Sequence, residues 1–181
     1  MTIITPSKWL ADLLQDSYLR EYPVEVVYNT INTEIFCPTP GNFREEHGLQ
    51  NEKIILGVAS VWEERKGLRD FVKLSQMLPQ GYRIVLIGVD AEQAKTLPEN
   101  ILALPRTNSP QQLAQIYTAA DVFVNPTYED NYPTVNLEAR ACGTRIACYN
   151  TGGCAETLGQ GDVLVAKGDV DALLRAICEI K

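Results

Sequence analysis

Carboxylates stand on both sides of a predicted strand-to-helix turn in the second half of the chain. Glu129 and Asp130 lie in an acidic, polar turn after the apolar run 121–125, and Glu138 follows within the next helix. Pro133 favours a helix start, because its fixed φ and missing N–H suit a first helical turn. An open helix N-terminus binds anions, whereas carboxylates repel phosphate and accept hydrogen bonds from hydroxyl groups. A phosphate-bearing sugar or a nucleotide would supply both kinds of group.

A basic pair stands earlier in the chain, between another apolar run and another predicted helix. Arg65 and Lys66 occupy this turn. Lysine is a compact positive charge and arginine can bind two oxygens at once, so the pair suits a diphosphate. The alternative is a pair of solvated loop charges, since most charged side chains are exposed.

The segments that would position these residues follow a regular pattern from residue 53 onward. Short apolar strands alternate with amphipathic helices, which predicts βαβ units and a parallel sheet covered on both faces. Right-handed crossovers then give an α/β fold with a doubly wound, Rossmann-like sheet. Ligands of such sheets lie beyond the carboxyl ends of the strands, where most of the candidate residues fall. The expected strands are 53–59, 83–88, 101–104, 122–125, 145–149 and 163–165, and the expected helices are 68–78, 91–97, 110–120, 134–142 and 170–180.

The segments before residue 53 have a different pattern. Residues 3–5 and 24–28 are expected strands, and residues 8–14 are an expected helix with Ser7 as its cap. Proline, glycine and mixed charge over residues 37–51 predict a surface connection.

Composition excludes several classes of protein. A net charge of −7 over 181 residues argues against a general nucleic-acid binder. No stretch approaches the roughly eighteen unbroken apolar residues of a membrane span, and the first residues lack a leader-peptide pattern.

Five cysteines, an odd number in apolar surroundings, predict reduced thiols in a cytoplasmic protein. With His47 as its single histidine and no CxxC pair, the chain is not expected to bind zinc. The acid-x-acid triplet 169–171 is expected to cap a helix.

Tyr128 to Gly143 resembles the signature of the retaining glycosyltransferases of family four, which have the GT-B fold. That signature has two acids with seven residues between them, followed by Ala and a Cys-Gly turn. Three further segments of this chain also resemble parts of the family's donor-binding half. Residues 24–32 resemble the segment that opens that half, and residues 54–59 with 65–68 resemble its first strand and phosphate-binding loop. Residues 150–153 with Glu156 resemble its late Gly-Gly loop.

The resemblance implies roles for single residues. Lys66 matches the family's phosphate-binding lysine. The family's arginine stands five residues earlier, where this chain has Val61, so Arg65 is the candidate substitute. Glu138 matches the second acid, which accepts hydrogen bonds from the ribose hydroxyls of the donor; a pairing with Arg140 or solvent is the structural alternative.

The first acid of the signature has two candidates. Asp130 keeps the register with Glu138, whereas Glu129 has the family's usual side chain. The resemblance implies that this acid contacts the donor sugar and is the candidate catalytic residue. It also implies that the nucleobase is met after the strand 101–104, where Pro105 and Arg106 stand. The remaining expected donor contacts are Asn131, Tyr132, Pro133, Thr134 and Val135, together with the N–H group of Asn136.

The resemblance also implies the organisation of the chain. Residues 1–22 are expected to be the end of an acceptor-binding half, 23–52 the linker and start of the donor-binding half, and 53–181 the nucleotide-sugar donor-binding domain. The other part of the acceptor half would be missing from this chain. Gly152 and Gly153 would let backbone approach the ligand or form a plain turn.

The expected function is that of a group 1 type glycosyltransferase. The full-length protein would be a hexosyltransferase of polysaccharide biosynthesis, moving a sugar from a UDP-, GDP- or ADP-linked donor to a hydroxyl on a saccharide or lipid-linked acceptor. No metal and no further cofactor is expected, because basic side chains and a helix N-terminus would stabilise the diphosphate. The fragment alone is expected to be inactive, and any contact with the inner face of the membrane is expected to involve the missing half.

Two alternatives belong to other classes of protein. The first is an isolated nucleotide-sugar-binding module, since a donor half without its acceptor half does not exclude water. The second is a doubly wound domain of another kind, such as a sugar-nucleotide epimerase-like domain, because this fold hosts many functions.

Overall fold

The computed structural model describes residues 1–180, and its main feature is a six-stranded sheet in which all strands are parallel. The strands lie in the order β5-β4-β3-β6-β7-β8, so the order along the sheet reverses between β3 and β6. This is the arrangement of a doubly wound sheet, in which the reversal opens a crevice at the carboxyl ends of the two central strands. The strands are β3 (Lys53–Val58), β4 (Tyr82–Ile87), β5 (Ile101–Leu104), β6 (Val122–Asn125), β7 (Arg145–Tyr149) and β8 (Val163–Val165).

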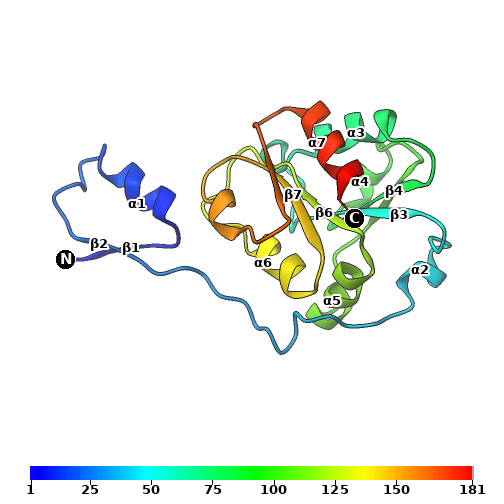
Figure 1. The fold of residues 1–181 in the computed structure, drawn as a ribbon, viewed down its shortest axis with the longest axis horizontal. Coiled ribbons are helices and arrows are strands. Elements are labelled where there is room, and N and C mark those ends of the chain that lie inside the picture. Colours follow the sequence, from blue (N-terminus) through cyan, green and yellow to red (C-terminus); the bar gives the residue numbers. More distant parts are fainter. Residues whose placement is uncertain (181) are drawn as a thin grey trace.

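Helices cover both faces of this sheet (Figure 1). On one face α3 (Leu68–Met77) and α7 (Val170–Glu179) pack over a core that includes Phe71 and Leu173. The other face carries α2 (Phe43–Glu46), α5 (Pro110–Ala119) and α6 (Thr134–Ala141). The shorter elements are α4 (Ala91–Ala94) and two 3-10 turns, η1 (Glu64–Lys66) and η2 (Cys154–Thr157).

The predicted doubly wound sheet is confirmed, and each predicted strand and helix is present within a few residues of its expected ends. Ser7 and Asp169 cap α1 (Lys8–Leu14) and α7 as expected, each through its side-chain oxygen. The prediction for residues 37–51 was incomplete, because this segment contains α2 and buries Phe43 and Leu49 against the core.

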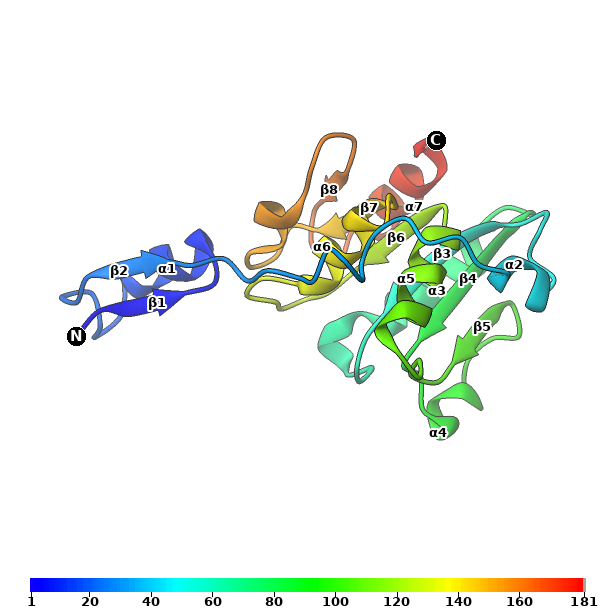
Figure 2. The ribbon, with the colours of Figure 1, turned by 90° about the horizontal axis from the view of Figure 1, so that it is seen from below.

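The chain before residue 29 forms a separate small unit, here called the N-terminal unit. It consists of β1 (Ile3–Thr5), α1 and β2 (Val24–Val26), with β1 and β2 paired in parallel. Figure 2 shows this unit beside the main domain, joined to it by an extended linker that runs past α6 and α5 to α2. The strand expected at 24–28 is β2, and it pairs with β1 and not with the six-stranded sheet, although its sequence resembles the segment that opens the donor-binding half of the family-four enzymes. The domain boundary at residues 22–23 stays a prediction.

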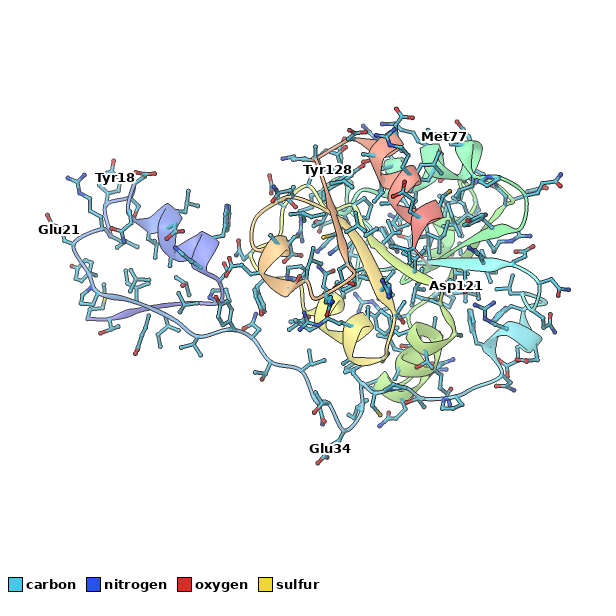
Figure 3. The ribbon with its side chains drawn as sticks, in the orientation of Figure 1. Tyr18, Glu21, Glu34, Met77, Asp121 and Tyr128 are labelled. Atoms are coloured by element: carbon cyan, nitrogen blue, oxygen red, sulfur yellow. The ribbon has the colours of Figure 1, made fainter. Side chains whose placement is uncertain are left out.

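The carboxyl edge of the main sheet faces the N-terminal unit. In Figure 3, Tyr128, which follows β6, lies on the side toward that unit, whereas Asp121, which precedes β6, lies farther from it. The loops expected to carry the site therefore lie on the side of the main domain that faces the N-terminal unit. Within residues 1–180, no helix has the length and apolar character needed to cross a bilayer.

Candidate active site

The loops after β3 and β6 meet at the point where the strand order reverses. The backbone N–H of Tyr128 donates to the carbonyl of Arg65 at 2.7 Å, and the hydroxyl of Thr127 donates to the same carbonyl at 3.1 Å. These bonds hold the basic pair of one loop against the acidic pair of the other. The two predicted groups of site residues, 62 positions or more apart in the sequence, thus form one crevice at the expected place.

An ion pair lies in this crevice. The Lys66 ammonium is 2.7 Å from Oδ2 of Asp130, and the two side chains are only 20% and 18% exposed. The second oxygen, Oδ1, accepts a hydrogen bond from the backbone N–H of Tyr132 at 3.2 Å. Of the two candidate acids, Asp130 is therefore the one that pairs with the predicted phosphate-binding lysine.

Glycines allow the loops around this pair to approach closely. Gly67 has a left-handed φ of 74°, and a Cβ there would overlap the carbonyl oxygen of Pro126. A Cβ at Gly152 would overlap the carbonyl oxygen of Asp130, and one at Gly153 that of Asn131. The Gly-Gly loop therefore packs against the backbone that carries the candidate acid. This packing explains why its two glycines are needed without reference to a ligand.

A buried carboxylate on α3 holds the acidic loop after β6 in place through hydrogen bonds. Asp70, in the first turn of α3, is 1% exposed and accepts hydrogen bonds from the hydroxyls of Tyr128 at 2.8 Å and Tyr149 at 3.0 Å. Lys73 donates to its other oxygen at 3.1 Å. The hydrogen bond to Asp70 and burial raise the pKa of Tyr128, and burial followed by the charge of Asp70 raises the pKa of Tyr149. Asp70 was not predicted as a functional residue, because its partners come from two other segments of the chain.

Glu138 lies on α6 and faces α5. Its carboxylate accepts a hydrogen bond from the Tyr117 hydroxyl at 3.1 Å, and burial raises its pKa although that hydrogen bond acts in the opposite direction. The alternative pairing with Arg140 is not seen, since the Arg140 guanidinium donates to the carbonyl of Thr157 at 2.8 Å. The structure therefore places Glu138 beside Tyr117, while Lys66 and Asp130 form their own pair.

The two candidate arginines contact backbone carbonyls near the crevice. Arg65 pairs with Glu63 at 2.8 Å and reaches the carbonyl of Glu129 at 3.5 Å. Arg106 donates through Nε to the carbonyl of Ser60 at 2.7 Å, which ties the loop after β5 to the loop after β3. Beside Arg106 is a pocket of about 260 Å³, which Pro105 also lines.

The start of α6 differs in one detail from the expectation. Pro133 is the N-cap residue, with φ −70°, and Thr134 is the first helical residue. The N–H of Asn136, expected to be open to a ligand, donates to the carbonyl of Pro133 at 3.2 Å. The Asn136 side chain is buried between Asn125 and Thr157, so it anchors α6 to β6 and η2.

Pockets open along the edge where these loops meet. One of about 450 Å³ combines an aromatic ring of the N-terminal unit with carboxylates, amides and a lysine of the main domain. It is lined by Trp9, Tyr128, Glu129, Asp130, Asn131, Asn150, Thr151, Gly152 and Lys167. A neighbouring pocket of about 560 Å³ is lined by Glu64, Arg65, Gly67, Arg69, Asp70, Lys73, Tyr128, Glu129 and Lys167. Among residues 1–180, no cluster of three His, Cys, Asp or Glu side chains is placed to hold a metal ion.

Comparison with known proteins gives a consistent set of matches. A family model described as "Glycosyl transferases group 1" matches residues 41–181. The alpha-galactosylglucosyldiacylglycerol synthase of Streptococcus pneumoniae is 30% identical over 156 residues, which are 78% of this chain and 41% of the relative. An alpha-1,3-N-acetylgalactosaminyltransferase of Campylobacter jejuni, which acts on N,N'-diacetylbacillosaminyl-diphospho-undecaprenol, is 28% identical over 82% of this chain and 42% of its own length.

Solved structures confirm that the fold corresponds to one half of a GT-B protein. A sucrose-phosphate synthase from Thermosynechococcus elongatus matches with a TM-score of 0.86 and 24% identity, over 99% of this chain and 48% of that one. HepE of Anabaena in complex with UDP-glucose matches with a TM-score of 0.82 and 17% identity, over 98% and 53%. The chain thus spans about half the length of these proteins.

Proposed function

Because the chain belongs to the group 1 glycosyl transferases, we propose that it is the donor-binding half of a retaining hexosyltransferase and binds a nucleotide-diphosphate sugar in the crevice between β3 and β6. The observation that carries this proposal is the Lys66–Asp130 pair, which puts a cation and a candidate sugar-binding acid together where the strand order reverses. UDP-glucose bound to HepE, a protein of similar fold, makes a UDP-sugar the first donor to test.

The proposed roles follow from charge and position. Lys66, with Arg65 beside it, binds the diphosphate, and the N–H groups at the start of α6, Thr134 and Val135, add further donors. Asp130 binds sugar hydroxyls, and Glu138 accepts hydrogen bonds from the ribose. The nucleobase lies toward the loop after β5. The remaining proposed contacts are Glu129, Asn131, Tyr132, Pro133 and Arg106.

In the proposed transfer, the bond between the anomeric carbon and the diphosphate oxygen breaks, and a bond forms from that carbon to an acceptor hydroxyl oxygen. The acceptor proton is released, and negative charge develops on the leaving diphosphate. Lys66 stabilises this charge, and electrostatic stabilisation of developing charge is usually the largest single term in enzymatic catalysis. On this proposal the reaction needs no metal and no further cofactor.

The acceptor would bind to a half of the protein outside this chain. The names of two relatives contain diacylglycerol and diphospho-undecaprenol, which supports an acceptor hydroxyl on a lipid or a lipid-linked saccharide. We place the whole protein in the cytoplasm, with peripheral contact to the membrane through its acceptor half. Without that half this chain binds donor and transfers nothing, because water is not excluded from the reacting carbon. Family membership argues against the epimerase-like alternative.

Calorimetric titration of the chain with UDP, GDP and ADP tests the proposal, beside a transfer assay with the corresponding sugar nucleotides. One nucleotide should bind and no transfer should occur. Lys66→Ala should weaken the binding at least about tenfold, since it removes a charge-assisted contact to phosphate. Lys95→Ala is the matched control, because Lys95 is exposed and pairs with Glu92 at 2.7 Å, away from the crevice. Equal affinities of the two variants would refute the site.

A further inference from the structure

One short segment of the main domain contacts both the N-terminal unit and the candidate acid. The Glu156 carboxylate in η2 accepts a hydrogen bond from the backbone N–H of Lys8 at 2.7 Å and another from that of Trp9 at 2.8 Å, one to each oxygen. These N–H groups belong to the first turn of α1, where no carbonyl of the helix itself is available to them. Glu156 therefore supplies partners that α1 lacks.

The same segment reaches the candidate acid on its other side. Gly153, three residues before Glu156, donates its N–H to the carbonyl of Asp130 at 3.1 Å. It also lies against Ser7, which is fully buried and caps α1. Residues 152–156 thus connect the start of α1 with the backbone of Asp130.

A second contact joins the N-terminal unit to the loop of the candidate acid. The ring of Tyr28, at the end of the N-terminal unit, lies 5.3 Å from the ring of Tyr132, centroid to centroid. Tyr132 is the residue whose N–H binds Asp130. The N-terminal unit therefore contacts the loop 130–132 directly through Tyr28, and it contacts the segment 152–156, which hydrogen-bonds to that loop, through the start of α1.

The contact between Lys8 and Glu156 is a backbone hydrogen bond and not an ion pair of their side chains. The Lys8 ammonium is 2.7 Å from Asp12, so the atoms of Lys8 that meet Glu156 are those of its backbone. A substitution that removes the Lys8 side chain leaves the contact in place. The substitution Glu156→Ala removes both of its hydrogen bonds.

We propose that Glu156 is a positioning residue, which seats the N-terminal unit against the loop 130–132 and thereby holds Asp130 in place for the nucleotide sugar. The coupling to the sugar nucleotide rests on the function proposed above, whereas the seating does not.

The experiment compares Glu156→Ala and Glu156→Gln with Lys8→Ala as the matched control in the full chain. Amide hydrogen exchange at positions 8 and 9 reports the seating, and exchange at Ala11, whose N–H binds the carbonyl of Ser7 at 3.2 Å, reports the integrity of α1. We expect Glu156→Ala to speed exchange at positions 8 and 9 by about tenfold or more, as the loss of a charge-assisted hydrogen bond predicts, and to leave Ala11 unchanged. Glu156→Gln, which keeps one acceptor oxygen, should give an intermediate rate.

Titration of the same variants with UDP, GDP and ADP reports the coupling. The nucleotide that binds the wild-type chain should bind Glu156→Ala about three- to tenfold more weakly at an unchanged melting temperature, and should bind Lys8→Ala normally.

Unchanged exchange at positions 8 and 9 in Glu156→Ala, or equal effects of the Lys8 and Glu156 variants, would overturn the seating. Faster exchange with unchanged affinity would overturn the coupling. Failure of the wild-type chain to bind any of the three nucleotides would refute the proposed function, and with it the coupling, while the exchange data would still decide the seating.

Discussion

The two opposite charges at the reversal point of the sheet pair with each other. Lys66 and Asp130 are 2.7 Å apart and mostly buried, so a diphosphate that approaches Lys66 must compete with a carboxylate. The attraction of the ammonium for phosphate is thereby reduced, and the nearby charge of Asp130 repels an anion. In the proposed site this carboxylate accepts hydrogen bonds from sugar hydroxyls, so Asp130 would lower the affinity for phosphate and contribute to recognition of the sugar.

Asp130→Asn should therefore raise the affinity of the chain for the free nucleoside diphosphate. We expect about a threefold gain, because Lys66 loses a competing partner while the amide oxygen can still accept from the Tyr132 N–H. Affinity for the sugar nucleotide should rise less than affinity for the diphosphate. Calorimetry with both ligands measures the difference. A loss of diphosphate affinity would mean that Asp130 supports phosphate binding.

The raised pKa of Glu138 predicts how stability and nucleotide binding depend on pH. Burial raises its pKa above the usual 4.5, so the carboxyl group takes up a proton at a higher pH in the folded chain than in the unfolded chain. The ionised form costs stability above that raised pKa, and the cost disappears as pH falls through it. Only the ionised form accepts two hydrogen bonds from a ribose without presenting a proton of its own.

The ratio of nucleotide affinities between the wild-type chain and Glu138→Gln should therefore shrink as pH falls from about 7 to about 5, toward the range where a carboxyl group is protonated. At neutral pH we expect the variant to bind about tenfold more weakly. Titrations at several pH values measure the ratio, in which the titration of the nucleotide itself cancels. A ratio that stays constant with pH would contradict the assigned role of Glu138.

At the scale of elements, α3, β6 and β7 are joined beneath the site by Asp70. Its carboxylate accepts from Tyr128 and Tyr149, whose chain segments follow β6 and end β7. Tyr149 is fully buried, and its raised pKa means that it keeps its proton to a higher pH in the folded chain than in the unfolded chain. In an unfolded chain tyrosine titrates at about pH 10. The stability that this raised pKa contributes is fully present below about pH 10 and is lost as pH rises above it.

Tyr149→Phe should lower the free energy of unfolding by about 1–2 kcal/mol at pH 8, because a buried carboxylate loses a hydrogen-bond donor. Since the wild-type chain loses this contribution above about pH 10, the difference between the two chains should shrink from pH 10 to pH 11. Urea unfolding at each pH measures it. Tyr18→Phe is the control, as Tyr18 is fully exposed. If the two chains differed in free energy of unfolding by the same amount at about pH 10 and about pH 11, the Tyr149 hydroxyl would not lose its proton on unfolding.

The sequence predicted the elements of the main domain well, and the contacts between them less well. Apolar runs such as 54–56 and 122–124 are buried strands for the reason expected, and Pro133 marks the start of α6. The contact between Glu138 and Tyr117 depends on how α6 packs on α5, which periodicity does not specify. Likewise, nothing near Glu156 in the sequence indicates partners almost 150 positions away. Short strands such as β2 carry no register signal, so its pairing with β1 could not be predicted.

At the scale of the whole molecule, burial is distributed unequally between the N-terminal unit and the main domain. Among residues 1–180, every buried hydrophobic side chain lies at position 43 or later, while the N-terminal unit buries only the polar Thr5 and Ser7. Two strands and one short helix without an apolar core are not expected to be stable alone. The main domain, in contrast, contains a core on each face of its sheet.

The chain shortened to residues 29–181 should therefore unfold cooperatively with a melting temperature within about 4 °C of the full chain, a shift that corresponds to about 1 kcal/mol or less for a domain of this size. The loss of Ser7, Tyr28 and the partners of Glu156 should nevertheless weaken nucleotide binding, because the loop 130–132 loses its contact with Tyr28 and the adjoining segment 152–156 loses its contacts with α1. Differential scanning calorimetry and nucleotide titration measure the two effects separately. A fall in melting temperature of more than about 10 °C would show that the N-terminal unit contributes to the stability of the main domain itself, and the burial argument would then be wrong.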